Sequence, residues 1–166
     1  MIVHKLFHKT HFLCLKLGII AALLLYGLPA SAGNDRWSAI GLSGNTVEVL
    51  AINPTTPDIL YTGTGNGGVF KSSDGGSHWT EANTGLTGSQ AYALAINPST
   101  PDTLYVAIVS NGVFKTTDGG NNWVRANTGI TNTYVRALAI NPIVSDTLYA
   151  GTYGGGVFKS TNGGSN

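Results

Sequence analysis

Residues 91–123 read AYALAINPSTPDTLYVAIVSNGVFKTTDGGNNW, and this stretch decides the fold because its pattern occurs three times. Residues 47–79 carry an earlier copy, and residues 135–166 begin a later one. The shared triplet Ile-Asn-Pro recurs every 44 residues, at positions 52, 96 and 140. A period of about 40–50 residues is typical of β-propeller blades, each of which is a four-stranded sheet.

Each period is expected to form four strands. Short runs rich in β-branched and aromatic residues alternate with clusters of Gly, Pro, Asn and Asp, without helical periodicity after residue 32. In the middle copy the expected strands are residues 91–96, 103–109, 113–117 and 123–126. The predicted fold class is all-β, a partial β-propeller of about three four-stranded blades over residues 47–166, with the last blade incomplete. Residues 33–46, which contain Trp37, are expected to form a strand at the fourth-strand position of a preceding blade.

The first 32 residues have the organisation of a secretory signal peptide. Three lysines precede an apolar run over residues 17–26, and residues 30–32 (Ala-Ser-Ala) form a small-residue cleavage site. The apolar run is shorter than the roughly 20 residues of a membrane-spanning helix. We therefore expect cleavage after Ala32, no stable membrane insertion, and export to the periplasm or the extracellular space.

Charge and cysteine content narrow the classes of function. The chain has nine basic and eight acidic residues, and its leader contains three of the basic ones and none of the acidic ones. The remaining chain is thus slightly acidic, which disfavours nucleic-acid binding. The only cysteine, Cys14, lies in the leader, so the rest of the chain offers no disulfide and no His/Cys metal cluster. We expect neither a metal nor a cofactor.

A polar, glycine-rich loop links the third and fourth expected strands of each copy. It reads SSDGGSHW at residues 72–79, TTDGGNNW at 116–123 and STNGG at 160–164, and we call these segments the box loops. The Asp or Asn can accept hydrogen bonds from amides of the loop, the glycines can adopt positive φ, and the tryptophan can cover the turn. The residues with these structural roles are Ser72, Asp74, Gly76, Trp79, Thr116, Asp118, Gly120, Trp123, Ser160, Asn162 and Gly164. One carboxylate per loop is too few for calcium, which takes about six to eight oxygens.

The box loops resemble the Asp-box (BNR) pattern S/T-x-D-x-G-x-x-W of sialidase-type propellers. The longer repeat resembles exported bacterial BNR-like propellers, a group that includes proteins similar to photosystem II assembly factors and to sortilin-type receptors. Xyloglucanases with tandem propellers have similar repeats. The resemblance covers residues 37–166 and implies that the box loops lie on the face opposite the ligand site. It does not decide between binding and catalysis, since one propeller scaffold hosts many activities.

Positions at which the three copies differ are the candidates for a ligand site, because the shared positions build the blade. They fall just before the innermost strand, in the turn between the second and third strands, and at the end of the crossover between blades. The candidate ligand-binding residues are Glu48, Gln90, Tyr92, Tyr134, Arg136 and Tyr153. All are expected on one face, near the mouth of the propeller channel. The alternative interpretation is neutral variation on exposed loops.

Two classes of function remain open. The first is a binding or assembly scaffold for a protein or carbohydrate ligand, with self-association possible through the incomplete blades. The second is a fragment of a propeller glycoside hydrolase, xyloglucanase-like or sialidase-like. Most carboxylates occupy repeated turn or box positions, and the arginine set and Arg-Ile-Pro segment of sialidases are not matched. No catalytic residue is therefore assigned, and the binding scaffold is the favoured interpretation.

Overall fold

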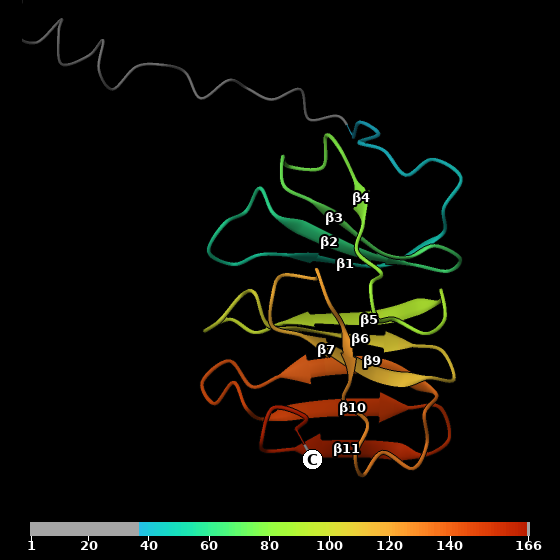
Figure 1. Cartoon of the computed structure of the whole chain (residues 1–166), viewed down its shortest axis with the longest axis vertical. Coiled ribbons are helices and arrows are strands. Elements are labelled where there is room, and N and C mark those ends of the chain that lie inside the picture. Colours follow the sequence, from blue (N-terminus) through green and yellow to red (C-terminus); the bar gives the residue numbers. More distant parts are fainter. Residues whose placement is uncertain (1–36, 166) are drawn as a thin grey trace, which may run out of the picture. The chain divides into compact units, whose positions relative to one another are not determined.

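The computed structural model describes residues 37–165, in which eleven strands form three antiparallel sheets stacked on one another (Figure 1). The first sheet contains β1 (Val47–Ile52), β2 (Leu60–Thr64), β3 (Gly68–Ser72) and β4 (Thr80–Glu81). The second contains β5 (Ala91–Ile96), β6 (Leu104–Ile108), β7 (Gly112–Thr116) and β8 (Val124–Arg125). The third contains β9 (Val135–Ile140), β10 (Leu148–Thr152) and β11 (Gly156–Ser160). Each sheet corresponds to one sequence period, which confirms the predicted all-β class and partial β-propeller.

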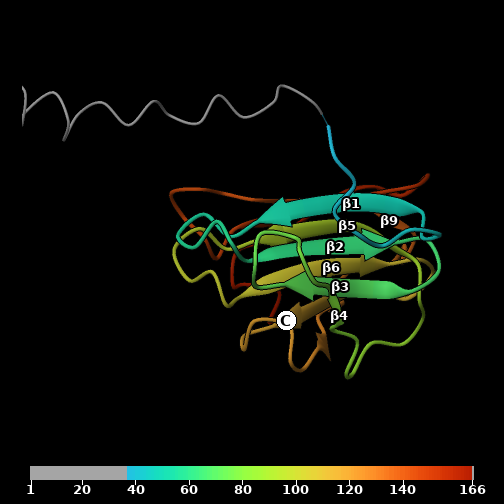
Figure 2. The same ribbon diagram turned by 90° about the horizontal axis from the view of Figure 1, so that it is seen from above.

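The strands of each sheet follow one another in sequence order. In every sheet the final isoleucine of the first strand is opposite the first leucine of the second strand, so the registers repeat with the sequence. The first strands β1, β5 and β9 gather on one side of the stack, whereas β4 and β8 lie on the other (Figure 2). This order is that of propeller blades, in which the first strand is innermost.

The second strands of the sheets lie in the core between neighbouring blades. Every residue of β2 and β6 is buried. In β10 burial alternates, because Leu148 and Ala150 pack in the cluster between the second and third sheets while Tyr149 is partly exposed. Such alternation is expected of a strand that packs on one face only. Apolar burial between blades, at roughly 25 cal/mol per Å², is therefore a main source of stability.

The structure differs from the predicted strands at the outer edge of each blade. The sequence predicts a fourth strand over residues 123–126, whereas β8 is only two residues long. Trp123 lies outside the strand, and its amide donates a hydrogen bond of 2.9 Å to the carbonyl of Thr84, in the crossover between the two blades. The bounds of β6 and β7 lie within one residue of the predicted ones, and β5 agrees with its prediction.

The predicted signal peptide, residues 1–32, lies outside the described residues, as do residues 33–36. Residues 37–46 contain bends and turns but no strand, so the strand predicted over residues 33–46 is not formed in its described part. A strand needs a hydrogen-bonded neighbour, and the described residues include no third strand of a preceding blade with which it could pair. Among residues 37–165, no helix has the length and apolar character needed to cross a membrane.

Candidate functional site

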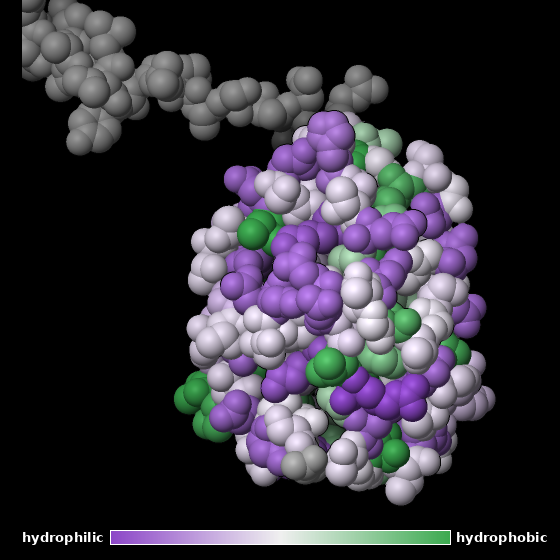
Figure 3. Space-filling model, in the orientation of Figure 1, coloured by the Kyte–Doolittle hydropathy of each residue, from purple (hydrophilic) through white to green (hydrophobic). Residues whose placement is uncertain are grey.

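The surface of the described chain does not reveal a site by hydropathy alone. On the face shown in Figure 3, polar residues are interspersed with apolar residues that lie apart from one another. Scattered apolar residues are normal on protein surfaces. The candidate site is therefore built from the positions of particular residues.

The two ends of each sheet carry different groups of residues. Val47 is opposite Thr64, and Thr64 is opposite Gly68, so the start of β1 and the turn between β2 and β3 share one end of the sheet. Leu60 is opposite Ser72 at the other end, where the box loop begins. The second and third sheets have the same register. The candidate ligand residues thus lie at the end opposite the box loops, and we call that end the rim.

A β-bulge occurs near the start of the first strand in every sheet. In the first sheet Val47 and Val49 are opposite consecutive residues of β2, which leaves Glu48 without an opposite residue. The residues at the corresponding bulges are Tyr92 and Arg136. A bulge bends the strand and changes the direction of the extra side chain. This position holds an acidic, an aromatic and a basic residue in the three copies. In each copy the bulge leaves it without an opposite residue in the neighbouring strand.

The end of each crossover is fixed beside the turn between the second and third strands by a backbone hydrogen bond. The amide of Val109 donates to the carbonyl of Gln90 at 2.9 Å, and the amide of Tyr153 donates to the carbonyl of Tyr134 at 2.8 Å. The first sheet has the same bond between Gly65 and Thr46, at 2.8 Å. The rim positions of one blade are therefore held together, although they are far apart in the sequence.

Four of the six predicted residues form one cluster, which we call the Tyr–Arg cluster: Tyr92, Tyr134, Arg136 and Tyr153. The guanidinium carbon of Arg136 lies 4.1 Å from the ring centroid of Tyr92 and 5.1 Å from that of Tyr134. The rings of Tyr134 and Tyr153 are 6.0 Å apart with an interplanar angle of 56°. Cation–π contacts at these distances attract the guanidinium to both rings. The cluster joins the second blade to the third, since Tyr92 is in β5 and Arg136 is in β9.

Arg136 is exposed, and no ion pair of its guanidinium occurs among residues 37–165. An arginine offers five N–H donors in a planar fork that fits a carboxylate. Glu48 and Gln90 are not part of the cluster. The Glu48 carboxylate lies over the neighbouring turn, where a Cβ added to Gly65 would be 3.1 Å from its Oε1, and Gln90 contributes its backbone carbonyl. No hydrogen bond within the described part of the chain joins either side chain to the Tyr–Arg cluster.

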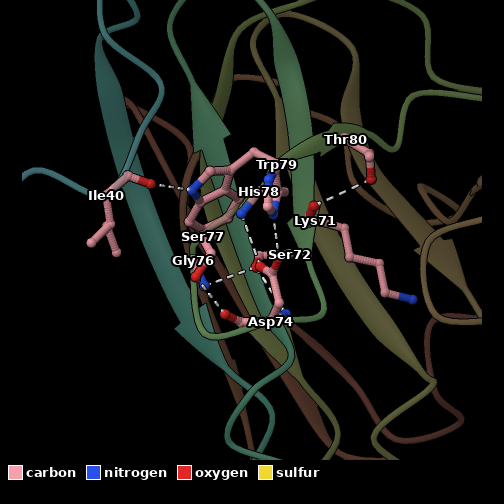
Figure 4. Close-up of polar contacts among 9 residues, drawn as sticks. All are labelled: Ile40, Lys71, Ser72, Asp74, Gly76, Ser77, His78, Trp79 and Thr80. Atoms are coloured by element: carbon pink, nitrogen blue, oxygen red, sulfur yellow. Dashed lines mark hydrogen bonds and ion pairs between the residues drawn. The ribbon is translucent and has the colours of Figure 1, made fainter.

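The box loops are closed by their acidic residues, as the sequence predicts. The amide of His78 and the hydroxyl of Ser72 each donate to Asp74 Oδ1 at 2.9 Å, and His78 Nδ1 lies 2.6 Å from Asp74 Oδ2 (Figure 4). These contacts, led by the His78 amide, lower the pKa of Asp74 to about 2. Gly75 and Gly76 have φ values of 69° and 92°, which glycine adopts without strain.

The second box loop repeats this arrangement with different neighbours. The side-chain nitrogen of Asn122 donates to Asp118 Oδ2 at 2.9 Å, and Thr116 Oγ1 donates to Asp118 Oδ1 at 2.7 Å. Hydrogen bonds from Asn122, and then from Thr116, lower the pKa of Asp118 to about 2. In the third loop Asn162 takes the place of Asp and still accepts from Ser160 Oγ at 2.8 Å. Asparagine therefore supports the same turn.

The low pKa values of Asp74 and Asp118 predict a loss of stability in acid. A carboxyl group with a folded-state pKa of about 2 and an ordinary pKa of 3.8 stabilises the fold fully above about pH 4, and this contribution disappears as the pH falls through 2. We expect the unfolding temperature to fall between pH 4 and pH 2, and to fall less in the Asp74→Asn, Asp118→Asn double variant. Calorimetry from pH 5 to pH 2 checks this, and equal acid slopes for the two proteins would contradict it.

A pair of residues that the sequence reasoning missed joins each blade to the next box loop. Tyr61 Oη and Lys71 Nζ both donate to the carbonyl of Gly119, each at 3.0 Å. Tyr105 and Lys115 make the same contacts, also at 3.0 Å, with the carbonyl of Gly163. Burial, and then the charge of Asp102, raise the pKa of Tyr61 to about 12, so the phenol remains a donor at neutral pH. The signal in the sequence that could have identified this pair is the recurrence of the Tyr and the Lys every 44 residues.

Solved structures share the fold of this chain, although their sequences differ widely from it. Neither a protein-family model nor a curated protein matches the sequence. An ancestral GH74 enzyme is similar over 74% of this chain and 18% of its own, with 22% identity and a TM-score of 0.64. A GH74 enzyme from Niastella koreensis is similar over 72% of this chain and 22% of its own, with 28% identity and a TM-score of 0.59. YCF48 bound to D1 peptide is similar over 74% of this chain and 40% of its own, with 16% identity and a TM-score of 0.56.

The fold is that of a β-propeller. The chain spans less than half the length of each of these structures, which include both enzymes and an assembly of protein with peptide. The similarity supports the propeller architecture. It does not identify a ligand, so the ligand is inferred from the residues of the rim.

Proposed function

We propose that the chain is a β-propeller binding module whose rim takes a protein ligand that carries a carboxylate. The Tyr–Arg cluster carries this proposal. Its guanidinium is oriented by two tyrosine rings, is exposed, and has no acidic partner among residues 37–165. Charge-assisted, bidentate contacts to a carboxylate are among the strongest hydrogen bonds that a protein surface makes.

The position of the cluster also supports binding. Tyr92 and Arg136 are in strands, and the bulge in β9 turns Arg136 out of the hydrogen-bonding ladder. Tyr134 directly precedes β9, Tyr153 directly follows β10, and a backbone hydrogen bond joins the two. Tyrosine rings add apolar contact area with little loss of conformational freedom, which favours them at protein interfaces. YCF48, one of the similar propellers, is bound to a D1 peptide in its structure. A propeller of similar fold can therefore bind a peptide.

A selection experiment tests the rim. We expect a phage-displayed random heptapeptide library to yield acidic peptides against the purified chain, and Arg136→Gln to weaken their binding by roughly 10-fold or more. Arg125→Gln is the matched control, because Arg125 is also an exposed arginine whose guanidinium carbon lies 5.5 Å from an aromatic ring centroid, but it is in the outer strand β8. Acidic peptides that bind the Arg136→Gln variant as tightly as the unaltered chain would refute the site.

We also propose that the protein is exported and that its box loops are Asp-boxes of the BNR type. The lysine-rich start, the apolar run and the Ala-Ser-Ala site support export. The carboxylate contacts and the positive φ values of the glycines support the assignment of the box loops. Sequencing of the mature N-terminus checks export, with a first residue of Gly33 expected. A cytoplasmic protein that still begins at Met1 would contradict it.

A second candidate function is part of a propeller glycoside hydrolase, supported by the likeness to GH74 enzymes. Glycosidases generally place two carboxylates around the scissile bond. Within residues 37–165, Glu48 is the carboxylate residue at the rim, whereas Glu81 is in the outer strand β4. The remaining aspartates are in or beside the box loops at the other end, at positions 58, 74, 102, 118 and 146. Release of reducing sugar from xyloglucan by the purified chain would favour this second function over binding.

A further inference from the structure

A shallow groove of about 400 Å³ runs across the first strands of all three blades, near the ends at which these strands turn into the second strands. β5 lies between β1 and β9, so the groove is centred on the second blade (Figure 1). None of the described residues that line the groove has a polar side chain. Matching positions of the three copies supply most of the lining: Ile52, Ile96, Ile140, Ala51, Ala95 and Ala139.

The core uses only part of the surface of these apolar residues. Ile96 and Ile140 pack against the clusters between blades. Even in the second blade, which has a described blade on each side, Ala95 and Ile96 keep part of their surface exposed. Together with their counterparts in the other copies they form a contiguous apolar surface, whereas exposed apolar residues are usually scattered. Such a surface favours contact with a partner.

The turns at the end of the groove are fixed by buried asparagines. Asn97 Oδ1 accepts from the amides of Ser99 and Thr100, at 2.9 and 3.1 Å. Asn53 does the same in the first blade, and both asparagines are buried. Pro54 and Pro98, which line the groove, directly follow these asparagines. The groove is therefore formed before a ligand arrives, which lowers the cost of binding.

The strands that form the groove also carry the centre of the Tyr–Arg cluster. Arg136 and Ile140 are both in β9, four residues apart, and Tyr92 and Ile96 have the same spacing in β5. At about 3.3 Å per residue, this spacing is roughly 13 Å. The guanidinium of Arg136 lies 4.1 Å from the ring centroid of Tyr92, so the cluster joins the same two strands. One pair of strands thus presents a base at the rim end and an apolar groove at the other.

We propose that the Tyr–Arg cluster and the groove bind one extended peptide segment, in which an acidic and an aliphatic residue are four positions apart. This inference rests on the proposed function of the rim, since the acidic residue is the one that Arg136 binds. An extended segment also rises about 3.3 Å per residue, and residues four positions apart lie on the same face of it. A carboxylate on Arg136 therefore brings the aliphatic side chain over Ile96 and Ile140.

The chemistry of the groove favours a peptide over a carbohydrate. Its lining offers no side-chain donor or acceptor to a sugar hydroxyl, which would lose hydrogen bonds to water without replacing them. An aliphatic side chain has no such cost and gains from leaving water. A charged anchor and an apolar anchor roughly 13 Å apart match two side chains of one extended peptide.

A phage-displayed nonapeptide library with a fixed central glutamate tests the spacing on the purified chain. Selection should enrich leucine, isoleucine or valine at one end of the peptide, four positions from the glutamate, and not at three positions from it. In the tightest binder, replacing this aliphatic residue with alanine should weaken binding roughly 10-fold, as measured by fluorescence anisotropy. Selected peptides without an aliphatic residue at either end, or equal binding of the alanine peptide, would overturn the proposal.

Variants of the chain place the aliphatic residue in the groove. Ala139→Gln puts a polar amide into the groove at an exposed position, without a change of charge, and should weaken the same peptide roughly 10-fold. Val124→Gln is the matched control, because Val124 is an exposed apolar residue of the outer strand β8, and binding should not change.

Arg136→Gln separates this inference from the function on which it rests. Binding that is weakened by Arg136→Gln but not by Ala139→Gln would overturn the groove and leave the rim as a carboxylate site. Binding that Arg136→Gln does not weaken would refute the rim function, and this inference with it.

Discussion

Trp123→Ala is expected to lower the free energy of unfolding by about 3–5 kcal/mol, the range seen for large aromatic residues removed from a core. Trp123 is only 3% exposed and belongs to the cluster between the first and second blades. Its indole donates to the carbonyl of Ala82, and that acceptor would lose its partner in the variant. The cost therefore combines a cavity with a broken contact between blades. Urea unfolding followed by circular dichroism measures it.

Trp79→Ala is the matched control for this prediction. Trp79 has the same position in the first box loop, but it is only partly buried, and its indole donates to the carbonyl of Ile40 at 3.0 Å (Figure 4). A smaller loss is expected because less apolar area leaves water at this site. Equal losses in the two variants would show that burial between two blades is not what makes Trp123 important.

Gly85→Ala is expected to cost about 2–5 kcal/mol, for two physical reasons that add. Gly85 has a φ of 88°, a conformation that alanine adopts only with strain. A Cβ at this position would also overlap the carbonyl oxygen of Trp123. The clash is with backbone, so it can be relieved only by moving the second blade away from the crossover. The loss is measured as the change in the urea midpoint, compared with the unaltered chain.

Gly129→Ala separates the two reasons. Gly129 is one period later, has a φ of 85°, and no atom of residues 37–165 would lie within 4 Å of an added Cβ. This variant should show only the conformational cost, about 1–2 kcal/mol. If both glycine variants lose the same stability, the close approach of the crossover to Trp123 has no energetic consequence, and backbone strain alone explains the loss at Gly85.

The candidate rim shows how far comparison of the copies within one sequence can go. Positions that differ between copies placed Tyr92, Tyr134, Arg136 and Tyr153 among the residues expected on one face, and in the structure these four lie together. The same reasoning included Glu48, which lies over its own turn and outside the cluster. Comparison of the three copies identified the positions of the blade at which the residue can vary without changing the fold. It could not predict which of them touch, because the contacts run from one blade to the next.

The box loops show the complementary limit. Their internal hydrogen bonds were predicted, since each carboxylate and its donors are at most four residues apart. Their external role was not, because the Gly119 carbonyl accepts from Tyr61 and Lys71, which are 58 and 48 residues away. The local sequence of a loop does not indicate which residues of a neighbouring blade contact its outer surface.

The sequence by itself determined the period, the four-stranded unit, the box turns and the variable positions at the rim. Each of these is local, arising from alternation, turn chemistry and hydrogen bonds within a few residues, and repetition made each one visible three times. The tertiary structure alone decided how neighbouring blades meet: the stacking of Arg136 on Tyr92, and the Tyr and Lys contacts to the next box loop. These depend on the distance and angle between sheets, which are set by packing of side chains about 44 residues apart and are not encoded in any single repeat.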